Sequence, residues 1–495
     1  MSLIKKLAGE TAIYGLSSIL SRLLNYVILT FYYTREFADG EYGIVSILFT
    51  YTAILLVLFT YRMETAFFRF GSTSGQLDQS FSTASLSIFG TTIILATILL
   101  LCRAPLATAL NFPDHPEYFT YIIFIIAFDA LAVIPFARLR LDNRPIRFAW
   151  FKTLHILLNL AFIFLFLEGF PWFAEMSGIP PSVFEDGKIG YVFIANLAAS
   201  LLIFLALLPA YFRITLQFDR VLWRKMIRYA MPLVVVGLAA VINQLIAMPL
   251  LENLLPGTLE ENRAAVGNYS AASKLAILMS LFTQAFNYAA EPFFFNHAER
   301  EDSQLVYAHV GRAFALVGSV VFLGILLYLD LIKLIIGAEM RGALQIVPIL
   351  LLAYYFLGWY YNFSIWYKLT DKTHFGMYIS LSGVAVTLLL NILLVPNPAF
   401  GYTGAALAAL ACYSLMAGLS YWTGRRYYPI PYAMRQMLGY TVGAVLIYYA
   451  SLGIGHYLQP GLLLGLVINT ALLLVYLGTI YWVEKDALRE MLSQK

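Results

Sequence analysis

Apolar segments about as long as a bilayer is thick dominate this sequence. A helix needs about 20 residues to cross roughly 30 Å of hydrocarbon, and fourteen such runs alternate with charged or Pro/Gly-containing breaks. The approximate limits of the fourteen runs are 11–31, 44–62, 84–103, 119–137, 148–167, 190–212, 229–250, 265–290, 312–329, 345–367, 375–395, 402–422, 437–457 and 461–482. The pattern predicts an all-α, polytopic membrane protein with about fourteen transmembrane helices.

The composition supports lipid as the main solvent of the chain. The 495 residues are 61% hydrophobic and 12% charged, with a mean hydropathy of +0.76, whereas soluble domains carry about twice that charge. Lys and Arg form no run typical of a nucleic-acid tail, so no nucleic-acid partner is expected. Cys102 and Cys412 are too few and too far apart to indicate a disulfide framework or a metal cluster.

The basic residues predict the orientation. When the connections are assigned alternately to the two sides, the side with both termini receives 23 Lys and Arg residues and the other side receives 6. Cytoplasmic loops carry this excess in membrane proteins. Both termini are therefore predicted to be cytoplasmic, in the inner (plasma) membrane of a bacterium.

An internal repeat relates the second span to the eighth. At an offset of 227 residues, GEYGIVSILFTYTAILLVLFTYRMETAFF from Gly40 matches GNYSAASKLAILMSLFTQAFNYAAEPFFF from Gly267 at nine of 29 positions. Similar composition in two aromatic-rich helices is an alternative explanation, but composition accounts least for polar matches such as Tyr42 with Tyr269 and Glu64 with Glu291.

The offset of the repeat contains six spans, so both copies have the same orientation in the membrane. Such parallel repeats occur in transporters that bind substrate between two lobes and expose it to each side in turn. We therefore expect a six-helix lobe at 1–212, a second at 213–436, and two further helices with a cytoplasmic tail at 437–495.

Ionisable residues inside the spans mark candidate sites, because a charge in hydrocarbon costs a few kcal/mol and normally faces a cavity or a partner. Polar residues recur at helical spacing around several of these charges. The candidates for a cationic substrate cavity are Arg22 and Asn25 on the first span, Lys152 and Asn159 on the fifth, and Asn268 and Lys274 on the eighth.

A cationic cavity between the lobes would suit a phosphate or pyrophosphate, since Arg binds these groups bidentately and Lys acts as a point charge. Lys152 could instead extend to the cytoplasmic interface. Asp129 is either a coupling site for a proton or another cation or the structural partner of a cation. Glu64 and Glu291, at equivalent helix exits, are either gate residues or helix-end contacts.

The sequence contains none of the common enzyme motifs that would favour catalysis over transport. The sequence has no GxxxxGK[ST], HExxH or paired Cys ligands, so we expect no catalytic residues, metal or cofactor.

Several segments carry a family resemblance. YGLSSILSRLLNY from Tyr14, GEYG from Gly40, METAFFRF from Met63 and its echo AAEPFFF from Ala289 resemble the multidrug/oligosaccharidyl-lipid/polysaccharide exporter superfamily. Within it, the chain looks most like bacterial oligosaccharide flippases of the Wzx type. The resemblance covers nearly the whole chain, although only the first helix and the two repeat segments are distinctive.

The resemblance implies two six-helix lobes arranged as a V, working by alternating access. It implies transport of a polyprenyl-(pyro)phosphate-linked oligosaccharide to the outer leaflet, for lipopolysaccharide or other surface polysaccharide. It also implies that the last two helices form a groove for the lipid tail. Expected partners are this substrate, membrane lipids, a coupling proton or sodium ion, and a polysaccharide polymerase or glycosyltransferases.

Two other transport functions, lipid II flipping and multidrug export, stay open as alternatives. A role as a scaffold that transports nothing also stays open. Lipid II flippases of the same superfamily carry cavity arginines at positions that Arg22 and Lys274 resemble, but Lys replaces Arg at the second. A cation-coupled multidrug exporter would use Asp129, although drug-exporting members usually have twelve helices. A scaffold for a polysaccharide synthase would tolerate alanine at Arg22 and Lys274.

Overall fold

The computed structural model is helical throughout the residues that it describes, namely 26–73, 76–142, 144–176, 187–212, 217–296, 300–459 and 461–493. No strand occurs in these ranges. Twelve of the helical stretches within them are long and apolar enough to cross a membrane. An all-α fold of many membrane-length helices is thereby confirmed, and fourteen is an approximate count.

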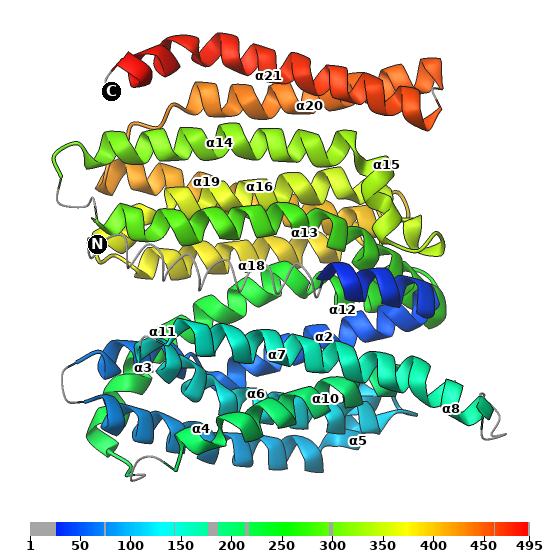
Figure 1. Cartoon of the computed structure of the whole chain (residues 1–495), viewed down its shortest axis with the longest axis vertical. Helices are drawn as coiled ribbons and strands as arrows, with labels where there is room; N and C mark the ends of the chain where they lie inside the picture. The colour runs from blue at the N-terminus through cyan, green and yellow to red at the C-terminus, as the bar shows by residue number, and fades with distance from the viewer. Residues whose placement is uncertain are drawn as a thin grey trace. The chain divides into compact units, whose positions relative to one another are not determined.

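The helices fall into two compact units, which we describe separately as unit 1 (Met1–Gly267) and unit 2 (Asn268–Lys495). The predicted lobe limits stay predictions. Unit 1 contains α2 (Asp39–Thr60), α3 (Met63–Gly71), α4 (Leu77–Leu101), α5 (Arg103–Ala109), α6 (Pro116–Leu141), α7 (Pro145–Phe164), α8 (Phe170–Met176), α10 (Lys188–Leu207), α11 (Arg220–Leu245), α12 (Ala247–Leu254) and the beginning of α13 (Leu259–Asn296). Unit 2 contains the rest of α13, α14 (Ser303–Leu327), α15 (Leu329–Ile332), α16 (Val347–Phe363), α17 (Ile365–Leu369), α18 (His374–Leu394), α19 (Tyr402–Tyr427), α20 (Met434–Leu458) and α21 (Leu462–Ser493) (Figure 1).

Helix α6 forms the core of unit 1. Pro116 occupies its first turn, where a missing N–H costs nothing because that group has no helical partner. The helix is apolar on nearly every side and packs against α2, α4 and α10, as expected of a helix buried all round. This packing brings the polar side chains of α6 against those of α7 and α10.

Small residues set the close packing of α14 against α16 in unit 2. A Cβ added to Gly358 of α16 would lie 2.0 Å from the ring of Phe314, and one added to Gly318 of α14 would lie 2.5 Å from the ring of Tyr355. Each glycine thus receives an aromatic ring from the other helix. Helix pairs in membranes commonly pack through such small residues, because backbones can then approach closely.

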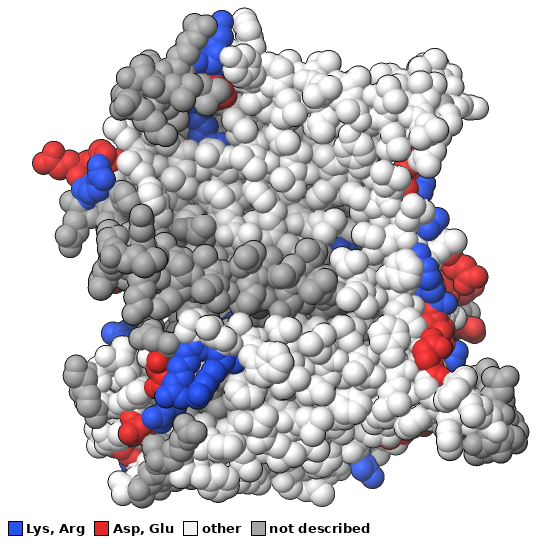
Figure 2. Space-filling view, viewed as in Figure 1, with Lys and Arg blue, Asp and Glu red and all other residues white. Residues whose placement is uncertain are grey.

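The hairpin of α20 and α21 attaches to α14, and the three helices lie side by side in Figure 1. Only 6% of the membrane-length window of α21 is buried, so most of this helix faces outward. In the space-filling view most charged side chains lie near the helix ends, and the surfaces between those ends are largely free of charge (Figure 2). This distribution suits helices that cross a bilayer.

Two predicted span boundaries need correction. The second span does not end at residue 62, because a helical stretch continues from Asp39 to Gly71 with a break between α2 and α3. The segment that contains the eighth span is longer than predicted, since α13 is one helix of 38 residues. The break in α2–α3 has no counterpart at Tyr288, where the second copy of the repeat continues as a helix.

Candidate functional site

The predicted site residues lie in different parts of the chain. Arg22 and Asn25 fall outside the described residues, and the side chain of Glu291 does too. Lys152, Asn159, Asp129 and Glu64 belong to unit 1, whereas Asn268 and Lys274 belong to unit 2. A shared cavity between lobes therefore stays a prediction, and each unit offers its own candidate site.

The break between α2 and α3 is the first feature of unit 1. Tyr61 and Arg62 both have left-handed backbones, with φ of 32° and 55°, a conformation that costs non-glycine residues of order 1–3 kcal/mol. The Tyr61 hydroxyl pairs with Ser87 Oγ at 2.7 Å, and Trp223 Nε1 donates to the same oxygen at 2.7 Å. Side chains from α4 and α11 therefore hold the break in place.

The break places a cation inside the span. Arg62 lies nine residues before the end of α3 at Gly71, which is about 13 Å along a helix. Its guanidinium lies 3.6 Å from Glu64 and against Gly237 of α11, where an added Cβ would be 2.5 Å from Arg62 Nε. Arg62 keeps 37% of its side-chain surface exposed, so the guanidinium has room for a further anionic partner.

Glu64 lies in the first turn of α3 and pairs with Arg62 at the break, so it is not at the end of the span. Its second oxygen, Oε2, is buried and has no hydrogen-bond partner within the described part of the chain. The gate interpretation is untested and stays a prediction.

A polar cluster lies between α6, α7 and α10. Asp129 of α6 interacts with Ser200 of α10 and with His155 and Lys152 of α7. Ser200 Oγ lies 3.4 Å from His155 Nε2 and 3.5 Å from Asn196 Oδ1. The cluster places a carboxylate, an imidazole and an ammonium group inside one unit, and a carboxylate beside an imidazole can exchange a proton.

Two residues proposed for substrate binding extend this cluster. Lys152 Nζ lies 4.1 Å above the centre of the Phe136 ring, and the side chain is exposed. Asn159, two turns further along α7, has a buried Oδ1 without a hydrogen-bond partner in the ranges that the structure describes. The structure thus places Lys152 within electrostatic range of Asp129, a relation that the sequence did not establish.

Helix α13 carries the candidates of unit 2. Asn268 Oδ1 accepts a hydrogen bond of 3.1 Å from the backbone N–H of Gly342, so this amide fixes the loop before α16. Lys274 is half-buried, near the middle of the 38-residue helix. It is therefore a cation well inside a long helix, although α13 is not among the twelve stretches that are both long and apolar enough to cross a membrane.

The first turns of α13 contact α2 backbone to backbone within unit 1. A Cβ on Gly43 would lie 2.0 Å from the carbonyl oxygen of Arg263, and one on Gly267 would lie 1.9 Å from that of Asp39. Arg263 donates from Nε to Glu252 at 2.8 Å and from Nη2 to the Asn111 carbonyl at 2.7 Å. The Gly-x-Tyr repeat pointed to these segments but not to their mutual contact.

The sequence missed a charged contact that holds the last helix. Arg312 of α14 donates from Nη2 to both oxygens of Glu484 of α21, at 2.6 and 2.5 Å, and the Tyr440 hydroxyl of α20 donates to the same carboxylate. The predicted last span ended at residue 482, so Glu484 was counted among tail residues. An acid directly after the apolar run that ends at Val483 was the available signal.

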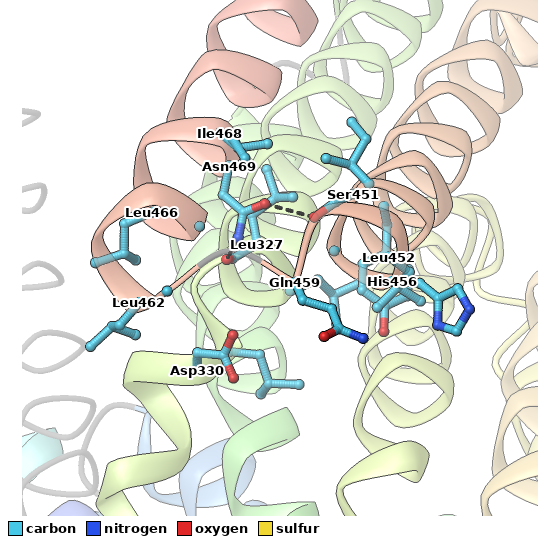
Figure 3. Close-up of a pocket in the computed structure, with 17 residues that line it drawn as sticks. Leu327, Asp330, Ser451, Leu452, His456, Gln459, Leu462, Leu466, Ile468 and Asn469 are labelled. Carbon is cyan, nitrogen blue, oxygen red and sulfur yellow. Dashed lines mark hydrogen bonds between the residues drawn. The ribbon is translucent and has the colours of Figure 1, made fainter.

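A cavity of about 430 Å³ lies at the far end of the same three helices from this ion pair. Asn469 donates to the carbonyl of Leu327 at 2.7 Å and accepts a hydrogen bond of 2.6 Å from Ser451 (Figure 3). Asp330 and Gln459 lie below this hydrogen-bonded pair in the view, and Leu462 and Leu466 form an apolar side. The cavity can accept a ligand with both polar and apolar parts.

Metal binding would be a further use of the polar groups. No group of three His, Cys, Asp or Glu side chains that could hold a metal ion occurs in the described ranges. The groups that the two units do present are cations, carboxylates and hydrogen-bonding side chains, which can bind an anion or exchange a proton.

Comparisons with solved structures identify the fold. The chain aligns with "Lipid II flippase MurJ, inward closed conformation" at a TM-score of 0.73 and 14% identity, covering 96% of this chain and 99% of that one. It aligns with the Vibrio cholerae MATE transporter VcmN in the bent form at 0.56 and 14% identity, covering 88% and 98%. An inward-facing multidrug resistance MATE family transporter of the MOP superfamily aligns at 0.56 and 12% identity, covering 84% and 94%. At these identities the likeness establishes the fold alone.

Sequence comparison identifies the family. No curated protein sequence matches the chain, but the family model described as "Polysaccharide biosynthesis protein" matches residues 7–298, more than half of the chain. The superfamily predicted from the sequence is thereby confirmed, and the chain is a multi-pass membrane protein. It belongs to the polysaccharide biosynthesis protein family and has the fold of MurJ and MATE transporters.

Proposed function

We propose that the protein flips a polyprenyl-(pyro)phosphate-linked oligosaccharide from the cytoplasmic to the outer leaflet of a bacterial inner membrane. The product would supply lipopolysaccharide or another surface polysaccharide. The two lobes would alternate access to the substrate, and both termini would be cytoplasmic. The family and the fold support a lipid-linked flippase or a related transporter. The lipid-linked oligosaccharide as the transported substrate is our proposal.

The observation that carries the proposal is the presence of cations well inside long helices of this transporter fold. Arg62 lies at the break between α2 and α3 with part of its guanidinium exposed, and Lys274 lies half-buried in the middle of α13. Hydrocarbon does not tolerate such charges without an anionic or aqueous partner. Arg62 already pairs with Glu64, and a pyrophosphate headgroup would bind these cations in addition to their partners within the protein. Discontinuous helices are typical of transporter binding sites.

The same proposal assigns a route for the lipid tail. The outward surface of α21 is largely exposed and apolar, and the hairpin of α20 and α21 carries the amphipathic cavity of Figure 3. A polyprenyl chain can lie along this surface, because it needs only an apolar wall. The headgroup alone would then have to cross through polar surroundings.

A cation would drive the cycle from the cluster around Asp129. The Asp129 carboxylate and the His155 imidazole can exchange a proton, and the charge on this carboxylate acts on the ammonium group of the nearby Lys152. We therefore propose coupling to a proton or sodium ion at Asp129 rather than at Glu64 or Glu291.

The test is genetic complementation in a strain that lacks the gene and related exporters. Wild-type protein should restore surface polysaccharide, whereas Arg62→Ala and Lys274→Ala should leave lipid-linked repeat units trapped on the cytoplasmic side. Arg435→Ala removes an exposed charge near the start of α20 and serves as the control. Normal polysaccharide in the deletion strain would reject the proposal, and harmless Lys274→Ala would favour a scaffold.

A cation-coupled drug exporter is the second candidate, favoured by the Asp129 cluster. It predicts altered drug susceptibility on deletion and overexpression, and loss of that effect in Asp129→Asn. A lipid II flippase would instead rescue cells depleted of their own lipid II flippase. Rescue of peptidoglycan synthesis without any change in surface polysaccharide would replace our proposal with this alternative.

A further inference from the structure

A shallow basic cavity lies where α19 ends beside the start of α18, in unit 2. Its volume is about 440 Å³, and Phe375, Trp422, Thr423, Arg425, Arg426 and Tyr427 line it. Its lining does not include Lys274, and Arg62 and the cluster around Asp129 belong to unit 1. The proposed function leaves it unexplained.

Three of the lining residues form one surface of α19. Trp422, Arg425 and Arg426 are spaced three and four residues apart, which places them on the same helix face. Trp422 is 72% exposed, and both arginines are exposed as well. Lys372, just before α18, adds a third cation, because its Nζ lies 4.0 Å above the ring of Tyr427.

The charge of this surface is not neutralised by neighbouring acids. Within the portion of the chain that the structure describes, no ion pair joins Arg425, Arg426 or Lys372 to a carboxylate. The cavity lining contains two guanidinium groups and no carboxylate. Guanidinium groups bind phosphate oxygens bidentately, so an anion with a phosphate group fits this surface.

The surface continues into an apolar strip one turn deeper. Tyr378 of α18 is 59% exposed and Leu381 is 42% exposed. On α19, a Cβ at the exposed Gly418 would meet nothing within 4 Å. Acyl chains can therefore lie along both helices below the arginines, an arrangement that favours a lipid over a free phosphate.

We propose that this cavity binds the headgroup of an anionic phospholipid, such as phosphatidylglycerol. The phosphate contacts Arg425 and Arg426, and the acyl chains lie against Tyr378 and Leu381. The distribution of basic residues places this end of unit 2 at the cytoplasmic leaflet, where basic pockets between transmembrane helices bind anionic lipids. Trp422 sits at the level of the headgroups, as aromatic residues do at such interfaces.

The test is lipid titration of the purified full-length protein in detergent, with binding measured by native mass spectrometry. Each basic residue near an anionic headgroup contributes ~1 kcal/mol, so Arg425→Gln/Arg426→Gln should bind dioleoyl phosphatidylglycerol about 30-fold more weakly than wild type. Arg425→Lys/Arg426→Lys should retain part of the affinity, because lysine keeps the charge but loses the bidentate geometry.

Arg224→Gln/Lys225→Gln is the matched control, since it removes an adjacent, exposed basic pair from α11. This variant should bind phosphatidylglycerol like wild type, and dioleoyl phosphatidylcholine should bind all variants weakly. Equal losses in both double variants would overturn the proposal, as would equal binding of phosphatidylcholine. Displacement by millimolar inorganic phosphate would reassign the cavity to free anions, and preferential displacement by undecaprenyl pyrophosphate would reassign it to the transport substrate.

Discussion

The ion pair between Arg312 and Glu484 should hold the hairpin of α20 and α21 to α14 within unit 2. Helix α21 is mostly exposed, and Glu484 is one of the few polar side chains that it buries. Glu484→Ala would leave the Arg312 guanidinium without its carboxylate in a membrane-length segment. Loss of one partner of a buried ion pair costs about 3–5 kcal/mol.

We take the lower end of that range, because Arg312 keeps 20% of its side-chain surface exposed and Glu484 keeps 9%. The expected loss is about 3 kcal/mol. For a unit of about 230 residues, 1 kcal/mol corresponds to roughly 2–4 °C in melting temperature. Glu484→Ala should therefore lower the melting temperature by about 6–12 °C.

The assay is thermal unfolding of the purified protein in detergent, applied to a double-mutant cycle. Arg312→Met and Glu484→Leu should each destabilise the protein. The double variant should lose much less than the two single variants together, because no uncompensated charge remains and only the Tyr440 hydroxyl lacks its acceptor. Glu484→Gln keeps an acceptor for Arg312 and should fall between wild type and Glu484→Ala. Additive losses in the double variant would show that the two residues do not act as a pair and would refute the reasoning.

Three further predictions concern unit 1. Gly43→Ala should lower the melting temperature by several degrees, because its methyl group would overlap the Arg263 carbonyl at a cost of about 1–3 kcal/mol; Gly90→Ala, with open space around it, is the control and should have no such effect. Asp129→Asn should abolish cation-driven transport in proteoliposomes while substrate binding persists, and unchanged dependence on the ion gradient would exclude this residue as the coupling site. Burial raises the pKa of Glu252 above its ordinary 4.5, an effect that Arg263 only partly offsets. The folded state therefore takes up a proton at a higher pH than the unfolded state, and the contribution of Glu252 to stability should rise as pH falls from 7 toward 4.5. Glu252→Gln should flatten this rise when thermal unfolding is measured over that pH range.

The internal repeat shows which structural features a sequence pattern can predict and which it cannot. The match between Gly40 and Gly267 pointed to two segments that are both helical in the structure, since glycine and tyrosine spacing is visible in one dimension. It did not indicate the break at Tyr61 and Arg62, because Ser87 and Trp223 stabilise that backbone from helices far along the chain. A left-handed backbone at two non-glycine residues has no local signature.

For the candidate sites too, single residues could be recognised from the sequence, but the contacts between them could not. Asp129 and Lys152 were recognisable alone, because any charge in an apolar run is conspicuous, but their grouping with His155 and Ser200 depends on the packing of α6, α7 and α10. Glu484 was missed because the hydrophobic run ends before it, although the helix continues and Arg312 compensates its charge.

The sequence by itself determined that this chain is a helical membrane protein, because hydrocarbon imposes the length and composition of every span. Its distinctive segments, such as those that begin at Tyr14 and Met63, showed the superfamily by resemblance. Tertiary structure alone decided which polar groups meet, where the second span breaks and how the last hairpin is attached. Those features depend on contacts between residues separated by tens to more than a hundred positions, which no local pattern encodes.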